Sequence, residues 1–273
     1  MKLLDGSEVV QFIKERQAKQ VRNLRQSWNT IPRLAVVQTI DDPVIDTYVR
    51  LKRRYAEDIL VEFELHKIDQ ADAMTTIDEL NTRDDVHGII VQLPLANTDE
   101  TQQVLDRVAP SKDVDGLGSH PEFDPATPIA INWLLAAYGI DLPQRHIAIV
   151  GNGRLVGAPL SRIWKSSGYD VTVYNRTSEN MPHVLLHHDI IVTATGVPGL
   201  ITSDIVQVGA VVVDAGTASE EGVVVGDVAT NVRERDDLTI TPIKGGVGPL
   251  TIAALLDNVI TAARRKADAT RSQ

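Results

Sequence analysis

The feature that most constrains the fold is the stretch from Ile147 to Pro159, which reads IAIVGNGRLVGAP. Its first four residues are apolar and uncharged, which predicts a strand buried on both faces, as in a parallel sheet. Gly151 and Gly153 follow at once, and helix-compatible residues resume from Leu155. A strand, a glycine turn and a helix in this order let backbone N–H groups meet a phosphate. Because Gly157 comes one place later than in the common dinucleotide fingerprint, a tight turn without a ligand stays an equal alternative.

Short apolar runs alternate with helical patterns along the rest of the chain. In the first third we expect strands over 34–37, 61–65 and 88–94 and helices over 9–24, 43–59 and 71–81. Asp42 and Pro43 give the second of these helices a capping residue and a first-turn proline. The remainder predicts helices over 98–108, 129–138 and 252–264, strands over 171–174, 190–193 and 211–214, smaller edge strands over 223–225 and 238–240, and a frayed polar tail over 266–273.

This order of elements predicts an α/β protein of two α/β domains, the second a Rossmann-like parallel sheet, with a cleft between them. We place the hinge near residues 118–128, because the loop from Pro110 to Pro128 lacks periodicity. A ligand site between the domains would draw on the carboxyl ends of strands from both.

Composition limits the classes of function. The 273 residues include no cysteine, which excludes disulfides, thiolate nucleophiles and cysteine-ligated metals. The formal net charge of −10 disfavours a nucleic-acid partner, since phosphate binding needs a basic surface. No apolar run reaches membrane-spanning length, and the N-terminal residues become polar too early for a signal peptide. His187 and His188 are interpreted as a solvated helix end, so we expect a cytoplasmic enzyme without a metal.

Three residues of the first domain, a tyrosine–lysine pair and a glutamine, combine polar or reactive groups with an informative location. Tyr48 and Lys52 lie four residues apart on a predicted helix and share one face, where a lysine with a shifted pKa can act as acid, base or hydrogen-bond donor. From spacing alone, an ordinary surface pair is the favoured alternative. Gln92 lies within an apolar strand and needs a hydrogen bond if it is buried, although on an edge strand it would instead face solvent.

Two loops carry further candidates. Asp113 and Asp115, in the run KDVDG, can accept hydrogen bonds from a ligand or simply cap a turn. The run GGVGPLT from Gly245 to Thr251 has three glycines in four positions. That density favours a loop whose backbone closely approaches a ligand.

Taken in order, these motifs resemble those of the bifunctional methylenetetrahydrofolate dehydrogenase/methenyltetrahydrofolate cyclohydrolase family. The family's Tyr-x-x-x-Lys, Val-Gln-Leu-Pro-Leu and Lys-Asp-Val-Asp-Gly match residues 48–52, 91–95 and 112–116. Its Pro-Cys-Thr-Pro and Gly-Gly-Val-Gly-Pro-Met-Thr are similar to residues 125–128 and 245–251. Any one of these could occur by chance, but the ordered set, from Leu34 to Asn258, is highly specific.

The resemblance implies an enzyme of one-carbon metabolism and purine biosynthesis. The substrate would be 5,10-methylenetetrahydrofolate, oxidised by hydride transfer to a nicotinamide cofactor and then hydrolysed to 10-formyltetrahydrofolate. Residues 1–122 and 251–273 would form a folate-binding catalytic domain to which the C-terminal helix returns. Residues 123–250 would form the NAD(P)-binding domain, and the protein would be a homodimer.

The resemblance also implies roles for individual residues. Lys52 would carry the proton transfers of hydrolysis, oriented by Gln92, while Tyr48 would pack against the substrate and shield the lysine. Asp115 would accept hydrogen bonds from the pterin amino group and ring N–H. The second glycine loop would bring the stretch from Gly246 to Pro249 close to the substrate.

The cofactor would lie on the first glycine turn, with contacts from Gly151, Asn152, Gly153, Arg154 and Gly157. After the following strand come Asn175, Arg176 and Thr177, with no acidic residue until Glu179. An arginine there suits the 2′-phosphate of NADP, whereas NAD is often recognised by an acid. We therefore expect NADP, although the three residues after the strand can also be interpreted as a solvated turn.

Departures from the family pattern leave other functions open. Ile45 stands where the family usually has serine, Lys244 replaces a usual proline, and Asn152-Gly153 replaces Arg-Ser. One alternative is a dehydrogenase that lacks cyclohydrolase activity, and another is a non-catalytic folate- or nucleotide-binding relative. A different NADP oxidoreductase, such as a shikimate dehydrogenase, fits less well because it has no place for the motifs at 112–116 and 245–249.

Overall fold

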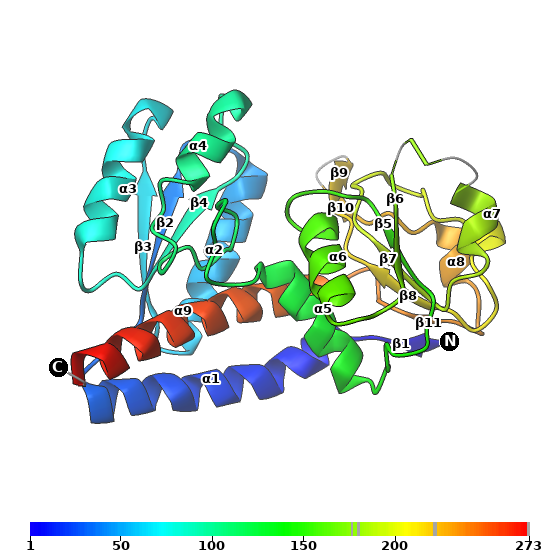
Figure 1. Ribbon diagram of the computed structural model, residues 1–273, viewed down its shortest axis with the longest axis horizontal. Helices are drawn as coiled ribbons and strands as arrows, with labels where there is room; N and C mark the ends of the chain where they lie inside the picture. Colours follow the sequence, from blue (N-terminus) through cyan, green and yellow to red (C-terminus); the bar gives the residue numbers. More distant parts are fainter. Residues whose placement is uncertain (176, 179–180, 221–222, 272–273) are drawn as a thin grey trace. The chain divides into compact units, whose positions relative to one another are not determined.

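The computed structural model describes residues 1–175, 177–178, 181–220 and 223–271. The chain divides into two compact units, drawn in Figure 1: unit 1 comprises residues 1–10 and 127–251, and unit 2 comprises residues 11–126 and 252–273. This division differs from the predicted one mainly in the first ten residues, because strand β1 (Lys2–Leu3) pairs with β11 (Thr239–Ile240) of unit 1. The cleft expected between the two domains stays a prediction.

Unit 2 is built on a parallel three-stranded sheet in the order β3-β2-β4, formed by β2 (Arg33–Gln38), β3 (Glu62–Lys67) and β4 (Gly88–Gln92). Figure 1 shows this sheet between α2 (Pro43–Asp58) and α3 (Ala73–Thr82). The core on the α3 side joins alternate residues of β2 and β4 to Ile77 and Leu80 of α3. The short elements η1 (Gln70–Asp72), η2 (Thr98–Glu100) and α4 (Thr101–Leu105) complete the connections, so the helix expected over 98–108 is shorter than predicted.

Helix α2 begins where the sequence predicts, because Asp42 caps it. The Asp42 carboxylate accepts two free backbone N–H groups of the first turn, at 2.8 and 3.0 Å. Further along, Ile45, Val49 and Ala56 are buried. Lys52 falls on the same stripe by its spacing of three and four residues, so the helix directs it towards the sheet.

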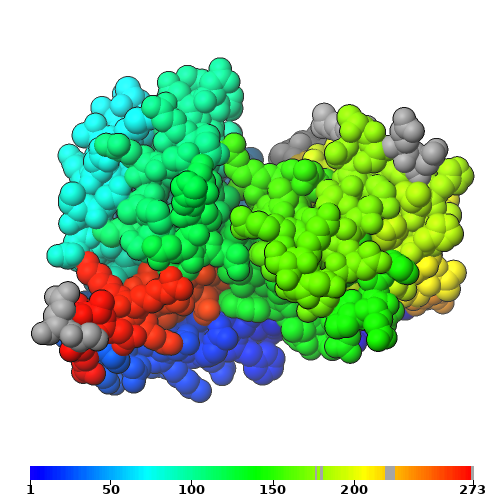
Figure 2. All heavy atoms as spheres, in the orientation of Figure 1, coloured from blue at the N-terminus to red at the C-terminus, as the bar shows by residue number. Residues whose placement is uncertain are grey.

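Two long helices, α1 (Gly6–Trp28) and α9 (Val247–Arg271), carry the chain from one unit to the other. Within unit 2 their outer parts lie side by side, as the blue and red atoms of Figure 2 show. The buried Gln17 of α1 donates to the Ala253 carbonyl of α9 at 2.8 Å and accepts from the Tyr55 hydroxyl at 2.9 Å. One side chain therefore ties α1, α2 and α9 together.

Unit 1 contains a six-stranded parallel sheet in the order β1-β11-β8-β7-β5-β6. Its longer strands are β5 (Ile147–Val150), β6 (Val171–Tyr174), β7 (Ile190–Thr193) and β8 (Val211–Asp214). Strand β5 lies between β6 and β7, so the strand order reverses there, as in Rossmann folds. The unit's remaining elements are helices α5 (Ala126–Ala137), α6 (Gly157–Ser166), α7 (Met181–Leu185), α8 (Thr230–Arg233) and η3 (Ser203–Ile205), and strands β9 (Ala218–Glu220) and β10 (Val223–Val225).

Several sequence expectations need correction. Strand β10 pairs with β9 in a separate antiparallel hairpin, and β11 is not an edge strand because β1 covers its outer side. Helix α6 begins at Gly157 rather than Leu155. Helix α9 runs from Val247 to Arg271, so the described part of the tail is helical rather than frayed. Among the described residues, no helix is long and apolar enough to cross a membrane.

Candidate active site

The structure brings Lys52 of α2 onto Gln92 at the carboxyl end of β4. The Lys52 Nζ donates to Gln92 Oε1 at 2.8 Å, and Gln92 Nε2 donates to the Leu93 carbonyl at 3.1 Å. Gln92 lies on an edge strand, but its side chain is half-buried and its amide oxygen accepts a hydrogen bond from the lysine. Since the amide nitrogen is held by a carbonyl, its oxygen is turned towards Lys52. The geometry therefore fits an oriented lysine.

Burial shifts Lys52 and Asp115 towards their neutral forms. It lowers the pKa of Lys52, and the attraction of the Asp115 carboxylate opposes this change. It likewise raises the pKa of Asp115, against the attraction of Lys52. In both groups desolvation outweighs the attraction, so the neutral amine of Lys52 is easier to reach near pH 7 than that of an exposed lysine. Such an amine can take a proton from water.

The loop that carries Asp115 is held by its neighbours. Asp113 accepts three backbone N–H groups from residues 116–118, at 3.0, 3.4 and 2.8 Å, so it caps the turn. Lys112 donates to three carbonyls at the end of α3. From α9, the buried Asn258 donates to the carbonyls of Val114 and Asp124 at 2.9 and 3.0 Å. The first two charged residues of KDVDG therefore have structural partners, whereas Asp115 has no hydrogen bond among the described residues.

Tyr48 lies one turn before Lys52 on α2 and is half-buried. Burial raises the pKa of its hydroxyl, so the phenol stays protonated at neutral pH. Among the described residues, no hydrogen bond engages this hydroxyl. Its ring and hydroxyl are therefore available to a substrate beside the lysine.

The first glycine turn lies at the carboxyl end of β5, where the sheet order reverses. Gly151 has a φ of +107°, and a Cβ there would lie 2.5 Å from the Ala194 carbonyl oxygen. A Cβ at Gly157 would lie 1.9 Å from the Gly151 carbonyl oxygen. At Gly153, by contrast, a Cβ would meet nothing within 4 Å. Gly151 and Gly157 are thus needed for the turn itself, while Asn152, Gly153 and Arg154 are exposed on its outer side, where a pyrophosphate would lie.

The residues after β6 form a local turn. The Asn175 Oδ1 accepts the Thr177 backbone N–H at 2.9 Å and the Thr177 hydroxyl at 2.7 Å. This is the solvated-turn arrangement considered from the sequence, and it is compatible with presenting polar groups to a phosphate. Arg176, on which the NADP expectation rests, lies outside the described residues.

The second glycine cluster has a structural explanation for two of its glycines. Gly245 has a φ of +85°. Gly246 packs closely against Gly6, because a Cβ added at Gly6 would lie 1.9 Å from the carbonyl oxygen of Gly246. Gly246 is buried, whereas Gly248 is exposed and open, and Pro249 is half-buried. Of this loop, the first turn of α9 at Gly248 and Pro249 is therefore the part that a substrate could reach.

Sequence reasoning missed a buried polar network at the ends of β7 and β8. Asp227 has no exposed surface, and the Asp214 carboxylate pairs with Arg233 at 2.8 Å. The available signal was an aspartate close behind each of two runs of three valines: Asp214 follows its run directly, and Asp227 follows its run after one glycine. His188 also differs from the expected solvated helix end, because it is buried and contacts the Val184 carbonyl through Nδ1 at 2.8 Å, whereas His187 is exposed as expected.

Comparison with known families decides the assignment. The family model described as tetrahydrofolate dehydrogenase/cyclohydrolase, catalytic domain, matches residues 4–115. The model described as tetrahydrofolate dehydrogenase/cyclohydrolase, NAD(P)-binding domain, matches residues 125–267. The chain belongs to the tetrahydrofolate dehydrogenase/cyclohydrolase family. This confirms the predicted family, the predicted two-domain α/β fold and the predicted enzyme class.

Individual members of the tetrahydrofolate dehydrogenase/cyclohydrolase family are similar over nearly their whole length. The bifunctional protein FolD of Macrococcus caseolyticus is 35% identical over 277 residues, covering 97% of this chain and 98% of the relative. The crystal structure of FolD from Campylobacter jejuni is 34% identical with a TM-score of 0.92, covering 97% and 99%. The Trypanosoma brucei enzyme, solved with NADP and an inhibitor, is 28% identical with a TM-score of 0.90, covering 96% and 97%.

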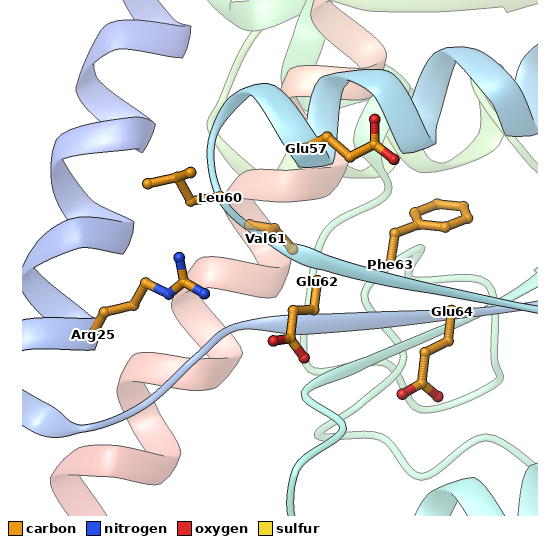
Figure 3. A pocket seen from close by; sticks show the side chains of 7 residues that line it. All are labelled: Arg25, Glu57, Leu60, Val61, Glu62, Phe63 and Glu64. Atoms are coloured by element: carbon orange, nitrogen blue, oxygen red, sulfur yellow. The ribbon is translucent and has the colours of Figure 1, made fainter.

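One pocket of this family member lies apart from the predicted site residues. Figure 3 shows its lining: Arg25 of α1, Glu57 near the end of α2, and residues 60–64 leading into and along β3. The lining combines one arginine with three glutamates and three apolar side chains, and none of the residues proposed for folate or cofactor binding contributes. Among the described residues, no group of three or more histidines and carboxylates is arranged to hold a metal ion.

Proposed function

We propose that this chain oxidises 5,10-methylenetetrahydrofolate with NADP and hydrolyses the methenyl product to 10-formyltetrahydrofolate. The observation that carries the proposal is the contact of Lys52 with Gln92 at 2.8 Å, beside an Asp115 whose loop is held in place. An amine that is oriented by an amide, and whose neutral form is favoured by burial, is suited to proton transfer. A binding protein without catalysis would have no need to bury a lysine in this way.

The first step needs positioning rather than a proton carrier. The substrate loses a hydride from its one-carbon bridge, and the lone pairs of the two bridging nitrogens stabilise the methenyl cation that remains. Asp115 would hold the pterin through its N–H groups, and Tyr48 would pack against the ring system. A bound NADP supplies the hydride acceptor.

The second step needs proton transfers, and Lys52 would perform them. Water adds to the methenyl carbon while the neutral amine of Lys52 removes one of its protons. The resulting ammonium returns a proton to the ring nitrogen N5, whose bond to the carbon then breaks and leaves the formyl group on N10. One proton is released overall, and Gln92 keeps the Lys52 nitrogen directed at the reacting atoms.

Three observations support NADP as the cofactor. The open outer side of the glycine turn suits a pyrophosphate, and Arg154 is exposed beside it. Arg176 follows β6, where an arginine can pair with a 2′-phosphate. The solved Trypanosoma brucei relative contains NADP. Arg176→Ala is expected to lower the ratio of the NADP to the NAD catalytic efficiency, and an unchanged ratio would remove this residue from the recognition of the phosphate.

The protein is also proposed to be a cytoplasmic homodimer. Strand β3 pairs with β2 on one side, and in the described structure no other strand covers its second edge. Such an edge offers free N–H and C=O groups for pairing with another copy. Sedimentation equilibrium should give twice the mass of the chain; the mass of one chain at micromolar concentration would contradict a stable dimer.

One spectrophotometric assay tests substrate, chemistry and cofactor together. Purified protein is mixed with methylenetetrahydrofolate and NADP or NAD, and formation of the reduced nicotinamide is followed. In a second arm, methenyltetrahydrofolate is supplied without cofactor and its loss is followed. Oxidation without hydrolysis would identify a dehydrogenase alone, and binding without either reaction would identify a non-catalytic relative.

A further inference from the structure

Two buried aspartates of unit 1 have no part in the chemistry described above. Asp227 follows β10, and Asp214 ends β8 with a side chain that is only 4% exposed. Burying a carboxylate costs free energy unless its oxygens are hydrogen-bonded. The groups that bond to these oxygens therefore show what the two residues hold in place.

Among the described residues, the donors to the Asp227 carboxylate come from the end of β7 and the loop after it. Its Oδ2 accepts the Thr193 hydroxyl at 2.6 Å and the Thr195 backbone N–H at 2.7 Å. Its Oδ1 accepts the Val197 backbone N–H at 3.0 Å. A single carboxylate thus fixes the backbone over five consecutive residues.

This loop lies next to the glycine turn. The Ala194 N–H donates to the Val150 carbonyl at 2.8 Å, and the Ala194 carbonyl oxygen occupies the space beside Gly151 where a Cβ would lie. Strand β5 has β6 on one side and β7 on the other, so the turn and the loop flank the point where the strand order reverses. Dinucleotides bind across this point. With the pyrophosphate on the glycine turn and the adenosine on the β6 side, the nicotinamide end falls on the loop after β7.

Asp214 in turn fixes Asp227. Its Oδ1 accepts the Asp227 backbone N–H at 3.0 Å, and its Oδ2 accepts the Val228 N–H at 3.1 Å and pairs with Arg233 at 2.8 Å. Two glycines make room for the carboxylates. A Cβ at Gly216 would lie 2.1 Å from Asp227, and a Cβ at Gly226 would lie 2.1 Å from Asp214. The arrangement leaves Asp227 little freedom to move.

We propose that Asp227 is a positioning residue for hydride transfer, because it fixes the backbone of Thr195 to Val197 as the surface on which the nicotinamide end of NADP lies. The inference rests on the proposed function. Asp227 itself is enclosed and touches no reacting atom. Its effect passes through the loop, where a displacement of about 1 Å can cost roughly a hundredfold in rate.

The test compares Asp227→Asn with the wild-type enzyme and with Asp236→Asn, a matched change at an exposed residue of the same unit. Asparagine keeps the shape but puts an N–H group in place of one oxygen, so at least one loop donor loses its acceptor. We expect kcat for methylenetetrahydrofolate oxidation to fall roughly ten- to a hundredfold and the primary deuterium isotope effect to rise. Binding of adenosine 2′,5′-bisphosphate and hydrolysis of methenyltetrahydrofolate should stay within about twofold of wild type. Asp236→Asn should change none of these values.

A milder variant covers the case in which Asp227→Asn does not fold. Thr193→Val removes one donor and keeps both backbone donors, so it should lower kcat in the same direction by a smaller factor. If kcat is unchanged in the soluble variants while the wild type oxidises methylenetetrahydrofolate, the positioning role is wrong. Loss of adenosine 2′,5′-bisphosphate binding in parallel with kcat would show a general structural role instead. A wild-type enzyme that does not oxidise the substrate would overturn the proposed function itself.

Discussion

Replacing Gln92 in two ways should move the pH dependence of hydrolysis in opposite directions. In the proposed mechanism the neutral amine of Lys52 accepts the proton, so the rate should rise with pH as the ammonium loses its proton. Gln92 Oε1 accepts from Lys52 at 2.8 Å and stabilises the ammonium more than the amine. Gln92→Leu removes that support and should lower the pKa of Lys52. Gln92→Glu adds a negative charge and should raise it.

The size of the shift follows from the hydrogen bond. A bond to a charged group contributes about 1.5–3 kcal/mol, and about 1.4 kcal/mol corresponds to one pKa unit. The acidic limb of the profile should therefore move about one to two units lower in Gln92→Leu. It should move higher in Gln92→Glu. The maximal rate should fall in both, because neither side chain directs the Lys52 nitrogen as the amide does.

The assay is the loss of methenyltetrahydrofolate absorbance without cofactor, from pH 5.5 to 9 and corrected for the spontaneous reaction at each pH. Gln103→Glu, the same change at an exposed position of α4, serves as the control and should leave the profile unchanged. If both Gln92 variants lose activity with an unmoved profile, or if both profiles move the same way, Gln92 does not set the protonation of Lys52.

Three further predictions concern the supports of the two sites. Asn258→Leu should raise KM for the folate in both reactions and lower the free energy of unfolding by about 1–3 kcal/mol, measured by urea denaturation, because the carbonyl of Val114 loses its buried donor. Gly157→Ala should abolish NADP binding in a fluorescence titration while hydrolysis persists, whereas Gly153→Ala, with open space at its Cβ, should keep binding; equal behaviour of the two would refute the roles given to the turn. Lys112→Met should cost about 1–3 kcal/mol of stability because three carbonyls at the end of α3 lose their donor, with both kcat values retained because Asp113 and Asn258 still hold the Asp115 loop.

Much of the fold follows from local pattern. The run Ile147–Val150 is apolar throughout, Ile190–Thr193 is apolar except for its last residue, and both became central strands of the parallel sheet. Asp42 and Pro43 fixed the start of α2 through chemistry confined to one turn. Elements that depend on distant partners were missed. Strand β1 has two residues and exists because β11 lies beside it, which no local signal reveals.

The ends of α9 show the same limit. The sequence at its start predicts a glycine-rich loop. In the structure the helix already begins at Val247, because the preceding glycines pack against the chain near Gly6. The polar sequence at its end predicts a frayed tail. In the structure Lys266 pairs with Asp84 and Arg271 donates to the Ser27 carbonyl, so this end is held in place. Contacts between segments far apart in sequence decide both boundaries.

For the site, motif order was more informative than spacing. Tyr48 and Lys52 alone favoured a surface pair, and only the family's ordered motifs pointed to catalysis; the structure then placed Gln92 against Lys52. Asp113 and Asp115 looked equivalent in sequence, and only the hydrogen bonds to residues 116–118 separate the capping residue from the free one. The sequence around Asp227 gave little indication of its role, because the groups that donate to its carboxylate lie about thirty residues earlier in the chain.

The central claim is that Lys52 performs the proton transfers of hydrolysis and is not needed for hydride transfer. Stopped-flow measurement of both half-reactions in Lys52→Met tests it most directly. We expect methenyltetrahydrofolate hydrolysis to fall to the spontaneous rate while methylenetetrahydrofolate still reduces NADP in a single turnover. Hydrolysis at a near-normal rate in this variant would contradict the account.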